Sequence, residues 1–232
     1  MALYVIGDTH LSLSVDKPME VFSGWDRYEQ RLQEQWCSLV TEQDTVVIPG
    51  DVSWAMSLEQ AKEDFAFLNA LPGRKLLLKG NHDYWWTTRR KMDAFLAENG
   101  FDTIRFVHND AVAVDNCVAV CGTRGWFYDA EEDADQKILL REVGRLRTSV
   151  KAAVDTGLTP IVFLHYPPVW GGQVCEPFLQ VLREFGVTRC YYGHVHGPGI
   201  RQAFNGVYDG ISLQLASADA LKFVPLHVPC IK

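Results

Sequence analysis

Gly193-His194-Val195-His196-Gly197 is the stretch that best indicates the fold, and it directly follows the apolar run 189–192. Neutral imidazole is the commonest protein metal ligand, and the flanking glycines allow a sharp turn close to a bound group. On its own, a His-x-His pair also fits two ordinary loop histidines. It gains weight because other possible metal ligands in this chain also follow strand-like runs.

Five short apolar runs predict buried strands, at residues 2–6, 45–48, 75–79, 160–164 and 189–192. Each is followed by polar side chains, namely Asp8 and His10, Asp51, Asn81 and His82, His165, and His194 and His196. Taken singly, Asp8 fits a turn-capping residue and His165 a structural histidine. Ligands of open α/β sheets bind beyond the carboxyl ends of the strands. We therefore expect these side chains to converge on one rim.

The first half of the chain alternates strands with helices, which favours a mostly parallel sheet with crossover helices. Helices are predicted at 28–40, 57–71, 88–98, 135–154 and 176–185, and Ser57 and Gln60 have capping-box spacing. Successive early motifs are about 30 to 43 residues apart, as strand-helix-strand units require.

The sequence pattern changes after residue 102, where most predicted elements are short strands. They are predicted at 103–107, 111–114, 117–121, 202–208, 212–216 and 223–228. We expect Asp115-Asn116 to form a two-residue hairpin turn, Asn205-Gly206 to form a turn, and the acidic stretch 129–135 to be a solvated loop. We find no repeat and no clear linker, so the simplest interpretation is a single domain over residues 1–232.

Composition limits the possible partners and the compartment. The chain has 232 residues, 47% of them hydrophobic, and a net charge of −7, which argues against an extended nucleic-acid partner. A nucleotide substrate is still compatible, because bound cations supply local positive charge. There is no basic signal region, no apolar run near the roughly 18 residues of a membrane span, and no Cys-x-x-Cys among six cysteines. We expect a cytoplasmic protein with reduced thiols and no membrane partner.

Counting ligands distinguishes between kinds of metal site. Three oxygen donors and four imidazoles are too many for one tetrahedral ion, which excludes a mononuclear structural zinc site. These donors are Asp8, Asp51 and Asn81, with His10, His165, His194 and His196. Two ions sharing a carboxylate fit the set, and nitrogen and oxygen ligands without thiolate suit Mn, Fe or Zn.

The ordered motifs resemble those of the calcineurin-like metallophosphoesterases. The match runs from Gly7–His10 through Gly50-Asp51, Gly80–Asp83 and His165 to Gly193–His196. The resemblance implies a four-layer α-β-β-α sandwich of two mixed β-sheets flanked by helices. It implies one metal on Asp8, His10 and His196 and a second on Asn81, His165 and His194. Asp51 would bridge the two ions, and His82 would be the non-ligand histidine at the scissile ester.

The implied activity is metal-dependent hydrolysis of a phosphate ester. Two cations about 3.5–4 Å apart lower the pKa of a bridging water, and the resulting hydroxide attacks phosphorus in line. A protonated His82 would assist the leaving group. We expect a small phosphorylated substrate; a phosphodiesterase or nuclease using the same site is the alternative, and a non-catalytic scaffold is a third interpretation.

Three further features bear on the substrate. Protein Ser/Thr phosphatases of this superfamily follow the second motif with an acidic residue and an arginine, whereas this chain has Val52–Met56, so the match is closer to small bacterial-type phosphohydrolases. Arg124, in a glycine-rich loop, is a candidate phosphate contact. The aromatic run 84–86 fits either core packing or stacking on a ring.

Overall fold

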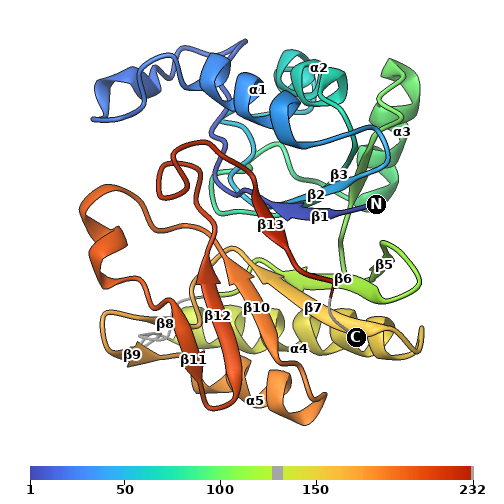
Figure 1. Cartoon of the computed structure of the whole chain (residues 1–232), viewed down its shortest axis with the longest axis vertical. Coiled ribbons are helices and arrows are strands. Elements are labelled where there is room, and N and C mark those ends of the chain that lie inside the picture. Colours follow the sequence, from blue (N-terminus) through green and yellow to red (C-terminus); the bar gives the residue numbers. More distant parts are fainter. Residues whose placement is uncertain (127–132, 231–232) are drawn as a thin grey trace.

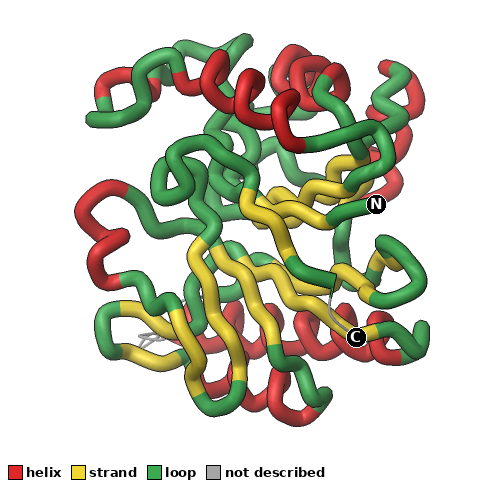
Figure 2. Tube along the Cα trace, viewed as in Figure 1, coloured by secondary structure: helices red, strands yellow, loops and turns green. Residues whose placement is uncertain are grey.

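The computed structural model describes residues 1–126 and 133–230. Two β-sheets pack face to face, and helices cover the outer face of each (Figures 1 and 2). The helices are α1 (Tyr28–Leu39), α2 (Lys62–Ala70), α3 (Arg89–Asn99), α4 (Asp133–Val154) and α5 (Glu176–Glu184). This confirms the predicted fold class. Within the described residues, no helix has both the length and the apolarity needed to cross a membrane.

The first sheet has five strands in the order β13-β1-β2-β3-β4. They are β13 (Leu226–Val228), β1 (Leu3–Val5), β2 (Thr45–Pro49), β3 (Arg74–Leu78) and β4 (Ile104–Phe106). Strands β1 to β4 are parallel and β13 is antiparallel to β1. Helices α1 to α3 cover its outer face (Figure 1).

The second sheet has six strands in the order β11-β12-β10-β7-β6-β5. They are β11 (Gly206–Tyr208), β12 (Ile211–Leu215), β10 (Arg189–Tyr192), β7 (Thr159–Leu164), β6 (Val118–Thr123) and β5 (Val112–Ala113). The four central strands are parallel and both edge strands are antiparallel. Helices α4 and α5 cover the face turned away from the first sheet (Figure 1).

Both faces of each sheet are buried, which explains why the strands are continuous apolar runs. Along β2, Val46 and Ile48 pack under the helices while Val47 packs between the sheets. Along β6, Val120 faces the intersheet core and Cys121 faces α4 and α5. Three apolar layers therefore hold the sandwich together.

Two predictions about where helices begin need correction. The helix predicted at 57–71 begins only at Lys62. One of the two capping-box bonds forms, because Gln60 N donates to Ser57 Oγ at 3.3 Å, whereas Gln60 Oε1 accepts from Met56 N at 2.9 Å instead of from Ser57 N. They close a separate turn, since the N–H of Lys62 bonds three residues back to Glu59. In the acidic stretch, residues 129–132 lie outside the described part of the chain, and α4 already begins at Asp133.

The hairpin turns differ from the predicted positions. Val114 N donates to Val118 O at 3.1 Å, so the loop between β5 and β6 has three residues, 115–117, rather than two. In the C-terminal hairpin the turn is Asp209-Gly210, with φ values of 49° and 79° that suit a two-residue turn. Asn205 instead accepts a hydrogen bond from Leu215 N at 2.8 Å.

Other strand boundaries in the second half of the chain also differ from the predicted ones. A 3-10 helix at Gly197–Gln202 occupies the start of the region predicted as strand 202–208. Strand β13 begins at Leu226, after Lys222 and Phe223 with positive φ. A short hairpin of β8 (Val169–Trp170) and β9 (Gln173–Val174) has no counterpart in the prediction.

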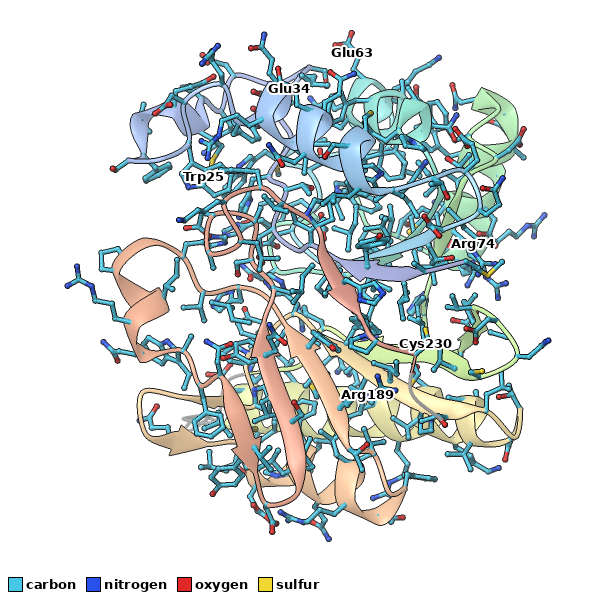
Figure 3. The ribbon with its side chains drawn as sticks, in the orientation of Figure 1. Trp25, Glu34, Glu63, Arg74, Arg189 and Cys230 are labelled. Atoms are coloured by element: carbon cyan, nitrogen blue, oxygen red, sulfur yellow. The ribbon has the colours of Figure 1, made fainter. Side chains whose placement is uncertain are left out.

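The parallel strands of the two sheets end on one side of the molecule. Figure 3 labels Arg74, the first residue of β3, at one side and Trp25 at the opposite side. The polar residues that follow β1, β2, β3, β7 and β10 gather on the side of Trp25, whose ring lies 5.8 Å from that of His196. The candidate site lies there.

Candidate metal centre

The first group of candidate ligands combines Asp8 and His10, which follow β1, with His196, which follows β10. His10 Nε2 and His196 Nε2 lie 3.3 Å apart, and His196 Nε2 lies 3.4 Å from Asp8 Oδ1. Asp8 and His10 are fully or almost fully buried. Each sheet therefore contributes to this group.

The second group combines Asp51 with His165 and His194. His165 Nε2 lies 3.2 Å from His194 Nδ1 and 3.5 Å from Asp51 Oδ2. Asn81 joins this group, because its Oδ1 lies 2.6 Å from His165 Nε2. Asp51 and Asn81 follow strands of the first sheet, and the two histidines follow strands of the second.

Asp51 belongs to the second group but also lies close to the first. Its Oδ2 atom is 3.5 Å from His165 Nε2 in the second group and 3.8 Å from His10 Nε2 in the first. Its other oxygen accepts a hydrogen bond from His82 N at 2.8 Å. One carboxylate oxygen is thus within reach of both groups.

The histidine pair in each group has the spacing of two ligands of one metal ion. Two ligands that bind one ion at about 2.0–2.1 Å are separated by about 3.0–3.4 Å. The nitrogen pairs at 3.3 Å and 3.2 Å have this separation. Burial lowers the pKa of His10 to about 3 and that of His194 to about 4, so both rings are neutral, the form that binds metal.

Buried carboxylates also favour a cation here. Burial, reinforced by Asp83 and Asp8, raises the pKa of Asp51 well above its usual range. Burial lowers the pKa of His196, but Asp8 and Asp219 outweigh it and raise that pKa to about 10. Several carboxylates therefore lie close together at a largely buried site, and a bound cation would stabilise their ionised forms.

Outer hydrogen bonds fix which ring nitrogen faces the site. His165 Nδ1 lies 3.2 Å from Pro49 O, and His196 Nδ1 lies 2.9 Å from Asp219 Oδ1. Both leave Nε2 directed at the other ligands, as in metal sites whose histidines donate their second N–H to an oxygen. Asp219 was missed by the sequence analysis, although it follows a predicted strand just as Asp8 and Asp51 do.

Asp83, the last residue of the third motif, ties two of the ligand loops together. Its carboxylate accepts hydrogen bonds from the backbone N–H groups of Asp51 at 2.9 Å and Gly80 at 2.7 Å. It also accepts the N–H of Val52 at 2.9 Å. Burial raises its pKa to about 6 despite these donors. The sequence predicts no role for Asp83. No sequence pattern marks a carboxylate that accepts several backbone N–H groups.

The backbone at the site is held in an unfavourable conformation. Of nine non-glycine residues with positive φ in the described chain, four are candidate ligands: Asp8, His10, Asp51 and His194. Such strain is concentrated at functional sites. The adjoining glycines permit close approach, since a Cβ at Gly193 would collide with Asp8 and one at Gly80 with Asp51.

Comparison with known proteins agrees with this geometry. The family model for calcineurin-like phosphoesterases matches residues 1–198. The chain belongs to the calcineurin-like phosphoesterase family. It is accordingly a metal-dependent phosphohydrolase, with two groups of residues able to hold metal ions. No curated protein matches the chain.

Solved structures share the fold of this calcineurin-like phosphoesterase at low sequence identity. A protein of unknown function from Aquifex aeolicus is 18% identical, with a TM-score of 0.54 over 97% of this chain and 95% of the other. The phosphopantetheinyl hydrolase of Mycobacterium tuberculosis is 14% identical, with a TM-score of 0.59 over 98% and 95%. A Thermus thermophilus protein is 11% identical, with a TM-score of 0.50 over 84% and 81%.

A cavity of about 420 Å³ opens directly onto the ligand groups of this phosphoesterase. Ligands from both groups and His82 line one part of it, and apolar side chains line the rest. The apolar residues are Met19, Phe22, Trp25, Trp54 and Pro198. Most come from the region 11–26, in which no helix or strand is predicted. Nothing in its pattern links it to the strand ends.

His82 lies in this cavity but belongs to neither ligand group. Its ring packs against Trp54 with centroids 4.3 Å apart, and Trp54 also stacks on His10 at 4.8 Å. The hydroxyl of Tyr84, which is 53% exposed, is 3.4 Å from His82 Nδ1. This position suits a histidine that meets a substrate rather than a metal.

The other two aromatics of the run 84–86 differ from Tyr84. Trp85 is 2% exposed, packs edge-on to Phe65 at 5.0 Å, and donates to Asp83 at 3.1 Å. Trp86 is half-buried and packs against His108. Core packing therefore accounts for Trp85.

Arg124 lies outside the cavity that holds His82. Its Nη2 is 3.6 Å from Glu142 Oε1 and its guanidinium packs over the Trp126 ring at 4.6 Å. Its backbone carbonyl accepts the N–H of His165 at 3.1 Å, so it supports a ligand through its main chain. A phosphate contact by its side chain stays a prediction.

Proposed function

We propose that this calcineurin-like phosphoesterase hydrolyses small-molecule phosphate esters at two metal ions. One ion would bind Asp8, His10 and His196, the other Asn81, His165 and His194, with Asp51 between them. The observation that supports this is the position of Asp51 Oδ2, 3.8 Å from a nitrogen of the first group and 3.5 Å from one of the second. Mn, Fe and Zn suit these donors.

When bound, the two ions supply an activated water and offset the charge on the phosphoryl oxygens. The chain itself orients the ligands, through Asp219 behind His196 and the Pro49 carbonyl behind His165. We assign His82 the role of donating a proton to the leaving oxygen. Its ring lines the cavity without joining either ligand group.

The cavity supports a small substrate. A volume of about 420 Å³ accommodates a group of the size of a small organic molecule. Its apolar wall, which includes Trp25 and Trp54, suits an aromatic or aliphatic leaving group. With a net charge of −7, we expect no extended nucleic acid and no anionic membrane surface as partner.

The first test is metal content together with turnover. Protein loaded with Mn²⁺ is expected to hold about two ions per chain and to hydrolyse an aryl phosphomonoester. Asp51→Asn should lose both properties, whereas Asp16→Asn, in the exposed part of the loop 11–26, should keep both. Parallel assay of an aryl phosphodiester distinguishes the phosphodiesterase alternative. Absence of bound Mn²⁺ together with absence of turnover would exclude the proposal.

A further inference from the structure

A second cavity, of about 380 Å³, lies apart from the one that holds the candidate metal ligands. We call it the cationic cavity and define it by Lys79, Arg124, Glu142, Arg145 and the Thr87-Thr88 pair. Lys79 directly follows β3, Arg124 directly follows β6, and Glu142 and Arg145 come from α4. It is built from regular elements rather than from loops alone.

Positive charge exceeds negative charge in this cavity. Glu142 is the one carboxylate among the described lining residues, and it is fully buried. It lies 2.6 Å from Arg145 Nη1 and 3.6 Å from Arg124 Nη2, while its other oxygen accepts from Thr123 at 2.6 Å. Three cationic side chains against one carboxylate leave two positive charges without a compensating anion among these residues.

Hydrogen-bond donors of residues that line the cavity also lack acceptors. Within the described structure, Arg124 Nε is buried and has no hydrogen-bond partner. Helix α3 begins at the cavity wall, and its N-cap residue Thr88 makes no side-chain capping bond. The first turn of α3 contains no acidic residue. Free N–H groups and the helix dipole at such an end favour an anion.

We infer that the cationic cavity is a binding site for a phosphate-class dianion, separate from the candidate metal centre. A phosphate carries about −1.5 to −2 charges at pH 7, which matches the excess charge of the cavity. Arginine is the side chain best suited to bind phosphate oxygens in pairs. An uncharged ligand would leave the excess charge uncompensated.

The cavity shares its supporting backbone with the metal centre. Lys79 is two residues before Asn81, and the Arg124 carbonyl accepts the N–H groups of His165 at 3.1 Å and Tyr166 at 2.8 Å. The dianion has two possible sources: a free anion such as inorganic phosphate, or a second anionic group on the ester being hydrolysed. Both have the chemistry that this cavity recognises.

Calorimetric titration of the Mn²⁺-loaded full chain with inorganic phosphate tests the inference. We expect a binding event that Arg124→Gln weakens about tenfold or more, because a hydrogen-bonded charge is lost. Glu142→Gln should tighten the same event several-fold, because it removes the opposing charge. Arg147→Gln is the matched control, since Arg147 lies on the same helix but pairs with exposed Glu184. Circular dichroism checks that each variant is folded.

Two further experiments distinguish this site from the metal centre and identify the source of the anion. In Asp51→Asn the cavity event should persist, so failure of the proposed function would leave it measurable. If an aryl phosphate bearing a second phosphate group displaces the bound phosphate, the anion belongs to the substrate; if it does not, the anion is free. Phosphate affinities that are equal in the wild type, Arg124→Gln and Glu142→Gln would overturn the inference.

Discussion

His196 Nδ1 lies 2.9 Å from Asp219 Oδ1, on the side of the ring opposite to the Nε2 atom that faces Asp8. The same carboxylate accepts the N–H of Gly197 at 3.0 Å, so it holds both the ring and the backbone of the His-x-His loop. Asp219 thus positions a candidate ligand without being one.

Replacing this carboxylate tests that role. Asp219→Ala should weaken Mn²⁺ binding by about 10–100-fold, because an outer partner fixes the ring and raises its basicity. Asp219→Asn should lose less, since its amide oxygen still accepts the Nδ1 hydrogen. Calorimetric titration with Mn²⁺ measures the effect. Equal affinity in the wild type and Asp219→Ala would mean that the contact does not support a ligand.

His82 is expected to act on the leaving group and not on the metals. His82→Ala should retain its Mn²⁺ while losing about 10²–10⁴-fold in turnover of an alkyl phosphate. The loss should be smaller for a nitrophenyl ester, whose leaving group needs no proton. His227→Ala, at an exposed position on β13, is the matched control. Wild-type turnover of alkyl esters by His82→Ala would contradict the assignment.

The absence of a side chain at Gly193 is expected to be essential to the ligand geometry. A Cβ at this position would collide with Asp8 Oδ2, so Gly193→Ala should displace Asp8 and abolish binding at the first group. Gly144→Ala, in α4, is the control, because a Cβ there meets nothing within 4 Å. It should stabilise the fold by up to about 1 kcal/mol. Metal content and thermal unfolding distinguish the two outcomes.

Because Lys75 is buried, the free energy of unfolding should depend on pH in the alkaline range. Its Nζ donates to Leu71 O at 2.5 Å and Gly73 O at 2.7 Å, and burial lowers its pKa to about 8. Between pH 8 and about 10.5 the unfolded chain binds more protons than the folded chain, so this residue makes stability rise with pH. The contribution over this window is on the order of 3 kcal/mol.

Urea unfolding at pH 8 and pH 10 gives the change in the free energy of unfolding between the two pH values. This change is compared between the wild type and two variants. Lys75→Met should lack the alkaline gain that the wild type shows, whereas Lys151→Met, at an exposed helix position, should keep it. If the free energy of unfolding changed equally with pH in the wild type and Lys75→Met, the pKa of Lys75 would not be lowered in the folded state.

The sequence predicted those parts of the site that depend on single strands. Strands buried on both faces are continuous apolar runs, so their ends could be located, and with them Asp8, Asp51 and His165. The second sheet came only from the family resemblance, because pairing of β6, β7 and β10 in a separate sheet depends on contacts distant in sequence. Local pattern does not contain that information.

Residues that act through long-range packing were not predictable in the same way. Trp25 and Trp54 both line the cavity because two irregular segments lie over the strand ends, and neither segment has a periodic pattern. The turn at Asn205-Gly206 was wrong for a related reason: the dipeptide suits a turn, but the Asn205 side chain bonds to Leu215 instead. Tertiary contact overrode local preference.

Each ligand group takes residues from both sheets, and this has a consequence for how the protein acquires its metals. The first group needs His196 and the second needs His194, so neither group is complete in a nascent chain that has emerged only as far as β10. Metal loading would therefore follow the emergence of β10 and of the two histidines after it. Once in place, each ion would join the two halves of the sandwich, so that chelation should loosen the contact between the sheets as well as stop hydrolysis.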